Sequence, residues 1–247
     1  MPELYLSPSR QDFNIYYDGS GSEKYYMDLI ADAMEPYLVA SGVSFTRSGD
    51  DMTLNQVIAA SNSQPYKLHL ALHSNASGAG NVGGQTGTDV YYYASSLQGL
   101  KAAEIIADNM RNIYPNPQKV RTVPNTTFAE LRSTNAPAVL IEIAYHDNMD
   151  DAEWIKNNIG PIARELALSV TEFLGVPFIE PTQEREGIVT TGGGRLNVRE
   201  APSLNANVIG QLANGTRVNV TGADGDWYTI TYNGLSGYVY AQYIKLD

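Results

Sequence analysis

Two histidines stand four residues apart in the stretch "KLHLALHSNASGAG", at positions 69 and 73. On a helix this spacing would put both imidazoles on one face, as in zinc-binding His-Glu-x-x-His helices. Here leucines alternate with His69, Ala71 and His73, and this period of two is typical of a β-strand. Residues four apart on a strand lie roughly 13 Å apart, so one metal ion cannot bind both. We therefore expect His73, at the carboxyl end of the strand, to be functional and His69 to be structural.

Three other polar residues stand where they could do chemistry. Glu142 interrupts the apolar run "AVLIEIAY", where an uncompensated buried carboxylate is costly. It is therefore either a catalytic base or ligand, or one half of an ion pair with Arg132. Glu23 opens a predicted helix, where a carboxylate also complements the helix dipole. Asn75, after His73, would by itself be an ordinary turn residue.

The elements that must position these residues alternate between short apolar runs and helical periods from Met1 to about Val176, as is typical of an α/β layer architecture. Strands are predicted at residues 4–6, 43–47, 68–73, 88–94 and 138–145, and helices at 23–42, 54–62, 97–114 and 150–175, the last bent at Pro161. The run at 138–145 is almost entirely apolar, as in a strand buried on both faces. We expect an α/β domain with a mixed central sheet and helices on both faces.

The pattern changes after residue 176. A polar stretch flanked by prolines, "VPFIEPTQEREG", is predicted to be a linker over residues 177–187. Residues 188–247 then show a period of two, with five or six short strands separated by Asn-Gly, Asp-Gly and glycine-rich turns. The sequence thus predicts one α/β domain over residues 1–176 and a small all-β barrel over residues 188–247.

Composition limits the classes of partner and of site that the protein can have. The formal net charge of the 247 residues is −11, which argues against a nucleic-acid partner, because such binding depends on Lys and Arg neutralising phosphates. The absence of cysteine excludes disulfides and cysteine-based metal sites. No apolar run reaches the ~20 residues that a membrane span needs, and the first residues lack the basic and apolar regions of a signal peptide. We expect a soluble globular protein.

The order of the motifs resembles a known family. A first strand, a glycine-rich loop leading to Glu23, "LALHSNAS" and "FAELRSTNAPAVLIEIAYHDN" follow one another over about residues 3–174, as in the zinc-dependent N-acetylmuramoyl-L-alanine amidases of the type-3 family. The resemblance implies that Glu23 and His73 are zinc ligands, that Asn75 belongs to a substrate-binding His-x-Asn-Ala motif, and that Glu142 is the catalytic base. The implied reaction is hydrolysis of the amide bond between N-acetylmuramic acid and L-alanine by a zinc-activated water.

The family's first ligand, a histidine after the first strand, is missing from this chain, which has "LSPSRQDFN" there. An arginine such as Arg10 cannot bind a metal, because it stays protonated. Gln11 or Asn14 could donate an amide oxygen instead, and His146, four residues after Glu142, offers the imidazole that zinc prefers. The alternative for His146 is that "YHDN" only caps its loop. The sequence leaves the third ligand open among these three residues.

The stretch from "GGRLNVREAP" to "GYVYAQYIKL" is similar to bacterial SH3-like domains, which bind cell-wall peptide or glycan. Its aromatic residues form either the barrel core or a ligand platform: Trp227, Tyr228, Tyr232, Tyr238, Tyr240 and Tyr243. We single out Trp227 and Tyr238 as candidates for wall contact. A tethered module of this kind raises the effective concentration of a catalytic domain at an insoluble substrate.

Together the two resemblances imply a peptidoglycan hydrolase of the endolysin or autolysin kind that acts on a Gram-positive wall. Without a signal peptide it would stay in the cytoplasm until it is released, as endolysins are, or be exported by an unrecognised route. Two alternatives remain open. One is a non-catalytic wall-binding protein whose metal site decayed with the first histidine, and the other is a metal-dependent wall peptidase.

Overall fold

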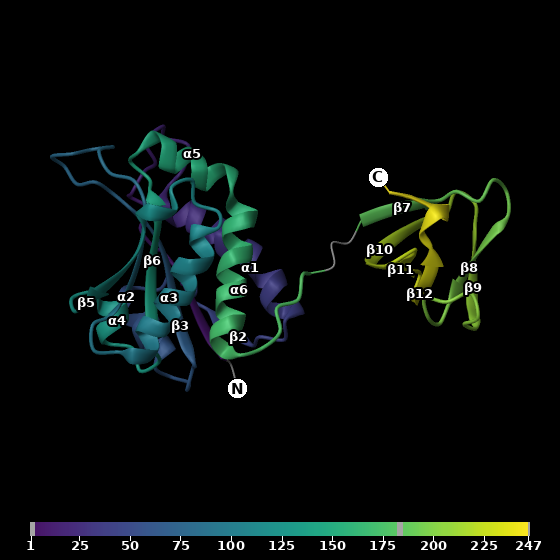
Figure 1. Ribbon diagram of the computed structural model, residues 1–247, viewed down its shortest axis with the longest axis horizontal. Helices are drawn as coiled ribbons and strands as arrows, with labels where there is room; N and C mark the ends of the chain where they lie inside the picture. The colour runs from purple at the N-terminus through teal and green to yellow at the C-terminus, as the bar shows by residue number, and fades with distance from the viewer. Residues whose placement is uncertain (1–2, 182–184, 247) are drawn as a thin grey trace. The chain divides into compact units, whose positions relative to one another are not determined.

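The computed structural model describes residues 3–181 and 185–246. The chain divides into two compact units, Met1–Glu180 and Pro181–Asp247 (Figure 1). Residues 182–184 of the predicted linker lie outside the described residues.

A six-stranded mixed sheet forms the centre of the first unit, in the order β2-β1-β3-β6-β4-β5. Its strands are β1 (Leu4–Pro8), β2 (Phe45–Arg47), β3 (Leu68–Asn75), β4 (Thr88–Tyr93), β5 (Val120–Asn125) and β6 (Ala138–Tyr145). All neighbouring pairs run parallel except β4 and β6, which run antiparallel. The carboxyl ends of β1, β3 and β6 therefore meet at one edge of the sheet, where α/β proteins place their sites.

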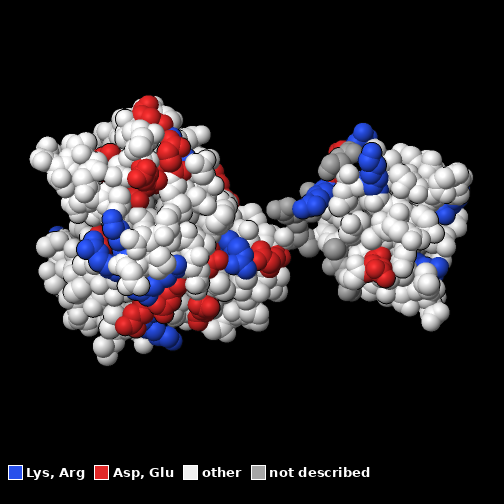
Figure 2. All heavy atoms as spheres, turned by 45° about the horizontal axis from the view of Figure 1, so that its top comes forward, with Lys and Arg blue, Asp and Glu red and all other residues white. Residues whose placement is uncertain are grey.

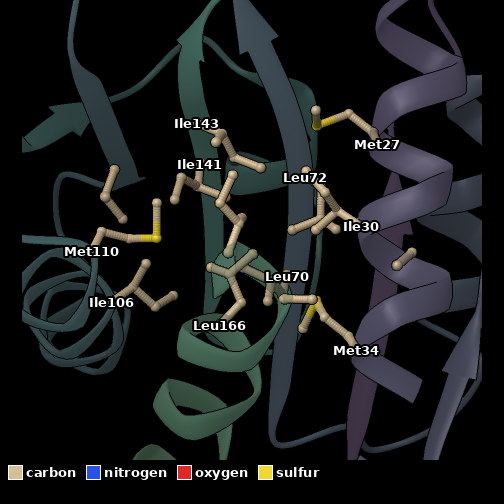
Figure 3. Packing of buried hydrophobic residues seen from close by; sticks show 14 of the residues in the cluster. Met27, Ile30, Met34, Leu70, Leu72, Ile106, Met110, Ile141, Ile143 and Leu166 are labelled. Atoms are coloured by element: carbon tan, nitrogen blue, oxygen red, sulfur yellow. The ribbon is translucent and has the colours of Figure 1, made fainter. Parts of the chain in front are cut away.

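Helices α1 (Glu23–Ala40), α3 (Leu97–Arg111) and α6 (Ile159–Leu174) cover one face of this sheet. Figure 3 shows how methionine and isoleucine side chains of α1 and α3 pack against leucine and isoleucine side chains of β3 and β6. These strand residues alternate along each strand, so the apolar set points to one face and the intervening residues point to the other. The predicted α/β fold with a mixed central sheet is confirmed.

The opposite face carries the polar residues. It is covered by α2 (Leu54–Ser61) and the single turn α4 (Ala129–Arg132), which pack over small apolar clusters that include Val57 and Leu131. Because residues 69, 71 and 73 of β3 share this face, His69 and His73 both point toward α2 and α4 rather than into the main core. The same alternation puts Glu142 of β6 on this face.

Three features of this unit differ from the sequence-based expectation. The helix predicted over residues 150–175 is two helices, α5 (Met149–Asn157) and α6, separated at Asn158. Pro161 falls in the first turn of α6, where its missing amide proton costs no helical hydrogen bond, whereas a continuous helix would lose that bond. Strand β5 and helix α4 were not predicted, and a short 3-10 helix, Pro117–Lys119, precedes β5.

The second unit is an antiparallel sheet in the order β13-β7-β10-β11-β12-β8-β9. Its strands are β7 (Arg185–Val189), β8 (Arg195–Arg199), β9 (Val208–Ala213), β10 (Arg217–Asp224), β11 (Trp227–Tyr232), β12 (Leu235–Tyr240) and β13 (Ile244–Leu246), with a 3-10 turn at Ala241–Tyr243. The Asn-Gly turn between β11 and β12 has positive φ at both Asn233 and Gly234, as such hairpins require. Strand β7 begins inside the range predicted as linker and continues into the predicted all-β range. The described residues of this unit form seven strands, more than the five or six predicted.

Charged side chains of opposite sign lie close together on the face of the first unit seen in Figure 2. Ion pairs in this unit include Arg47 with Asp28 at 2.8 Å and Lys156 with Asp18 at 2.6 Å. Ion pairs near the surface contribute little to stability individually. Within the described residues, no helix combines the length and the apolar composition needed to span a membrane.

Candidate active site

The strand ends bring the predicted site residues together. His73 of β3 and Glu142 of β6 are direct neighbours in the parallel register of the two strands. A cavity of about 340 Å³ lies beside them, and both residues line it together with Ser7, Gln11 and Glu130. Its wall also contains apolar side chains from α2, β6 and the segment before α4: Leu54, Val57, Leu140 and Phe128.

Glu23 and His73 form the centre of the site. Ser22 caps α1 by accepting a hydrogen bond from the Tyr25 amide, which fixes Glu23 as the first helical residue. The buried Glu23 carboxylate lies 2.8 Å from His73 Nδ1. Burial alone would raise the pKa of Glu23, but its hydrogen bonds, chiefly with His73, outweigh that effect and hold the pKa below its ordinary value. Burial lowers the pKa of His73, and its contacts with carboxylates more than reverse this, so the pKa is raised well above its ordinary value.

Gln11 and Asn14, two of the candidates for the third ligand, lie beside Glu23 and His73. Gln11 Nε2 lies 3.4 Å from Glu23 Oε1 and 3.3 Å from His73 Nδ1. Asn14 Nδ2 donates to Glu23 Oε2 at 2.7 Å and to Gln11 Oε1 at 3.1 Å. The neighbouring Arg10 does not join them, because its guanidinium donates to Ser48. Of the three candidates for the third ligand, two therefore lie beside Glu23 and His73.

His146, the third candidate, lies elsewhere. Its ring Nδ1 is 2.8 Å from the backbone oxygen of Ser74, and the ring stacks on Tyr16 at 5.6 Å between centroids. His146 is buried, and its backbone amide donates to the Asn75 oxygen, which ties the loop after β6 to the end of β3. The structure thus gives His146 the loop-fixing role and does not bring it together with Glu23 and His73.

The donor set fits a metal ion only if Gln11 takes part. No group of three or more His, Cys, Asp and Glu side chains within residues 3–181 and 185–246 is arranged to hold a metal. With Gln11 included, the three donors are separated by 2.8, 3.3 and 3.4 Å. Three ligands at about 2.1 Å from a tetrahedral zinc lie about 3.4 Å from each other, so the triangle has the right size. Rotation of the Gln11 amide by half a turn would present its oxygen in place of Nε2.

Glu142 lies in a different electrostatic situation from Glu23. Its Oε2 is one of three buried side-chain atoms without a hydrogen-bond partner among the described residues. The alternative of an ion pair with Arg132 is not observed among these residues, and the Arg132 side chain is exposed. Burial raises the pKa of Glu142 to about 7, and the negative charges of Glu23 and Asp89 act in the same direction against the opposing effect of His73. A buried carboxyl that titrates near neutrality can both accept and return a proton.

Glu130 is a site residue that the sequence analysis missed. It belongs to the short helix α4 and is buried beside both histidines of β3. Its Oε2 accepts hydrogen bonds from Ser7 Oγ at 2.7 Å and His69 Nε2 at 2.9 Å, while its Oε1 lies 3.7 Å from His73 Nε2. The hydrogen bond from His69 and the nearby ring of His73 outweigh the effect of burial and lower the pKa of Glu130. The only signal in the sequence was an acidic residue in "FAELRST" next to predicted apolar positions.

His69 has the structural role that its position predicted. The side chain is fully buried, with Nδ1 2.9 Å from Ser61 Oγ and Nε2 bonded to Glu130. Asn75, predicted to bind substrate, uses its side-chain oxygen to accept the Ala76 amide at 2.8 Å, and it is not among the residues that line the cavity. Its substrate role stays a prediction.

The second unit has a cavity of its own, of about 320 Å³. Its lining combines three aromatic residues with two arginines: Trp227, Tyr240, Tyr243, Arg195 and Arg199. Trp227 is mostly buried and packs edge-on against Tyr240 at 5.3 Å between centroids. Tyr238, the other residue singled out from the sequence, does not line this cavity.

A carboxyl with a near-neutral pKa, set beside a Glu–His pair in a cavity, marks a candidate catalytic site. Comparison with known families agrees. Residues 11–172 match the N-acetylmuramoyl-L-alanine amidase family, and residues 194–245 match the bacterial SH3 domain. The chain belongs to the N-acetylmuramoyl-L-alanine amidase family and carries a bacterial SH3 domain, as both resemblances implied.

The chain is also similar to individual proteins. Bacteriocin BCN5 of Clostridium perfringens is 33% identical over 159 residues, which is 60% of this chain but only 18% of the bacteriocin. The catalytic domain of the amidase CwlV from Bacillus (Paenibacillus) polymyxa superposes with a TM-score of 0.62 at 18% identity, over 72% of this chain and 100% of that one. The catalytic domain of the CD27L endolysin, which targets Clostridia difficile, gives 0.53 at 22% identity, over 70% and 98%. At these identities the two structural likenesses show a shared fold.

Proposed function

We propose that the chain hydrolyses the amide bond between the lactyl group of N-acetylmuramic acid and L-alanine in the peptidoglycan of Gram-positive walls. The observation that carries this proposal is Oε2 of Glu142, which is buried without a hydrogen-bond partner among the described residues, beside His73 in the cavity. Family membership supplies the class of bond that is cut. The relative BCN5 is a bacteriocin and the structural neighbour CD27L is an endolysin, which supports action on a cell wall.

Glu142 would transfer protons in this reaction. Its carboxylate accepts a proton from the water that attacks the amide carbon, and the same carboxyl returns that proton to the departing amine of L-alanine. A pKa of about 7 suits both steps, because the group is partly ionised near neutral pH. The apolar wall of the cavity, which includes Leu140 and Phe128, would exclude bulk water from the amide.

Glu23, His73 and Gln11 would hold a divalent metal ion, most simply zinc. When bound there, the ion would supply Lewis-acid polarisation of the amide carbonyl and would acidify the attacking water. Asn14 would orient Glu23, since its amide donates to Glu23 Oε2. Its bond to Gln11 Oε1 would be given up when Gln11 turns that oxygen toward the ion. An amide is a weaker zinc ligand than the imidazole it replaces, so we expect the affinity for zinc to be reduced.

The SH3 domain would hold the enzyme at the wall. Its cavity offers aromatic faces next to two arginines, a combination that suits a peptide or glycan with carboxylate groups. Binding at this site would keep the catalytic unit near many copies of its substrate, which raises the rate without any change in the active site.

The test is product analysis on purified Gram-positive walls with the full chain, Glu142→Gln and Glu165→Gln as matched control. Glu165 is a buried carboxylate too, but it lies on α6 and pairs with Arg164 at 2.6 Å. We expect the wild type and Glu165→Gln to release N-terminal L-alanine without new reducing sugar, and Glu142→Gln to be inactive. Release of a different new N-terminus would indicate a wall peptidase.

A non-catalytic wall-binding protein is the second candidate. It is favoured by the contacts of Gln11, whose amide group meets both Glu23 and His73 and so partly satisfies them without a cation. Under this alternative the wild type would bind walls, hold no metal and release no product.

A further inference from the structure

Glu130 divides its two carboxylate oxygens between different partners. Oε2 accepts from Ser7 at 2.7 Å and from His69 at 2.9 Å, so it is already saturated by two donors. Oε1 has no such donor and lies 3.7 Å from His73 Nε2. His73 Nε2 is itself buried without a hydrogen-bond partner among the described residues. Glu130 Oε1, an acceptor, and His73 Nε2, a potential donor, therefore lie close to each other without forming a hydrogen bond.

We infer that Glu130 is a positioning residue that fixes the ring orientation and the tautomer of His73. With a proton on Nε2 directed at Glu130, the other ring nitrogen, Nδ1, is presented to Glu23 and Gln11. Carboxylates that accept the other ring N–H act in this way on many metal-binding histidines. The inference rests on the proposed function in one respect, because it assigns His73 Nδ1 to the metal site.

The surroundings of Glu130 make it a rigid support. Helix α4 is a single turn, and Thr134 Oγ1 donates to the Glu130 backbone oxygen at 2.6 Å. Ser61 of α2 completes the chain of contacts at 2.9 Å from His69 Nδ1. The carboxylate is thus tied to β1, α2 and β3 at once, which leaves only Oε1 to respond to His73. A movement of about 0.8 Å would turn the 3.7 Å separation into a hydrogen bond of ordinary length.

This arrangement gives His69 a role in orienting Glu130. On its own it is a buried histidine with two satisfied nitrogens, remote from any substrate. As a donor to Oε2, it holds the carboxylate so that the second oxygen is turned toward the ring of His73. The two histidines of the "HLALH" motif would then act together, although the strand keeps them too far apart to share one metal ion.

The experiment uses the full chain with three variants, Glu130→Gln, Glu130→Ala and the control Glu165→Gln. Glu165 matches Glu130 in exposure, since each residue is 7% exposed, but it lies on the other side of the sheet. The first measurement is the affinity for zinc ions alone by calorimetry. The second is the NMR correlation of the histidine ring nitrogens with their protons, which is tractable because the chain has three histidines.

We expect Glu130→Ala to weaken zinc binding about 10- to 100-fold. Glu130→Gln should fall between Glu130→Ala and wild type, because its amide offers one acceptor oxygen for three donors, and Glu165→Gln should stay within about twofold of wild type. In wild type we expect the His73 Nε2 proton to exchange slowly with solvent. In the Glu130 variants we expect this proton to exchange faster or to be undetectable. If Glu130→Ala does not fold, Glu130→Gln decides by both measurements.

Zinc affinity and a His73 Nε2 proton unchanged in folded Glu130 variants would overturn the inference. If wild-type protein binds no zinc, the proposed metal site fails, and the NMR measurement alone then decides the role of Glu130. A His73 Nε2 proton that depends on Glu130 would still support it as the residue that orients His73, whereas its absence in wild type would refute it.

Discussion

Replacement of Glu142 by glutamine should make the protein more stable and less active at the same time. In the folded state the pKa of Glu142 rises from an ordinary 4.5 to about 7, chiefly because the carboxyl is buried. Folding therefore favours the protonated form. The contribution of this group to stability is complete below pH 4.5, is lost as the pH rises toward 7, and is constant above that.

The magnitude follows from the size of the shift. At about 1.4 kcal/mol per pH unit, a rise from 4.5 to about 7 corresponds to a loss of about 3 kcal/mol in the free energy of unfolding above pH 7. Glutamine resembles the protonated carboxyl in shape and cannot ionise. Glu142→Gln should thus exceed the wild type in stability by up to ~3 kcal/mol at pH 8, and by almost nothing at pH 4. Its hydrolytic rate should fall by about 10²- to 10⁴-fold, the usual share of a general base.

The assay is chemical denaturation of metal-free protein at pH 4, 6 and 8, followed by wall hydrolysis with added zinc. Glu165→Gln serves as the control, since that variant removes a buried carboxylate that has an ion-pair partner and should be destabilised by ~1 kcal/mol. A Glu142→Gln variant that is less stable than wild type at pH 8 would refute the reasoning, because it would mean that the carboxylate is stabilised by a partner in the folded protein.

Three further predictions test other parts of the structure. Gln11→His should restore an imidazole as third ligand and raise the affinity for zinc at least about tenfold by calorimetry, and unchanged affinity would remove Gln11 from the metal site. Tyr243→Ala should weaken sedimentation with walls about tenfold, unlike Tyr232→Ala, because the two side chains are 38% and 37% exposed but only Tyr243 lines the SH3 cavity. Gly87→Ala should lower the free energy of unfolding by ~1–3 kcal/mol, because Gly87 has φ +126° and an added Cβ would lie 2.7 Å from a backbone oxygen. Gly80→Ala, with no atom within 4 Å of the added carbon, should change it by less than ~0.5 kcal/mol.

Much of the fold could be predicted because it depends on local periodicity. The alternation around His73 identified strand β3, and the apolar run around Glu142 gave the bounds of β6 without error. The break at Asn158 was missed because the helical period continues across it, and only the position of Pro161 within the new helix explains it. Strand β5 was missed because its sequence, "VRTVPN", has few apolar residues and contains a proline, which edge strands tolerate.

The site was less predictable, because it depends on which residues meet across the sheet. The sequence left the third ligand open among Gln11, Asn14 and His146, with imidazole chemistry in favour of His146, and only tertiary contacts separate the first two from the third. Glu130 could not be identified at all. Glu130 is part of the site because it lies close to two histidines that stand about sixty residues earlier in the chain. No rule of sequence spacing predicts that a one-turn helix contacts a strand so far away in the sequence.

The charges around His73 explain why one carboxyl in this site differs from the others. Glu23 and Glu130 each contact one nitrogen of the ring, at 2.8 Å and 3.7 Å, so the imidazole and its protons balance them and the pKa of each is lowered. Glu142, the third carboxyl, is balanced only in part by the charge of His73, which does not offset its burial, and its pKa rises instead. A cation held by Glu23 and His73 would displace the Nδ1 proton and add positive charge, which would favour the ionised form of Glu142. The carboxyl of Glu142 would therefore become a stronger acid when the metal site is filled, and its titration, followed by NMR, should move to lower pH when zinc is added to metal-free protein.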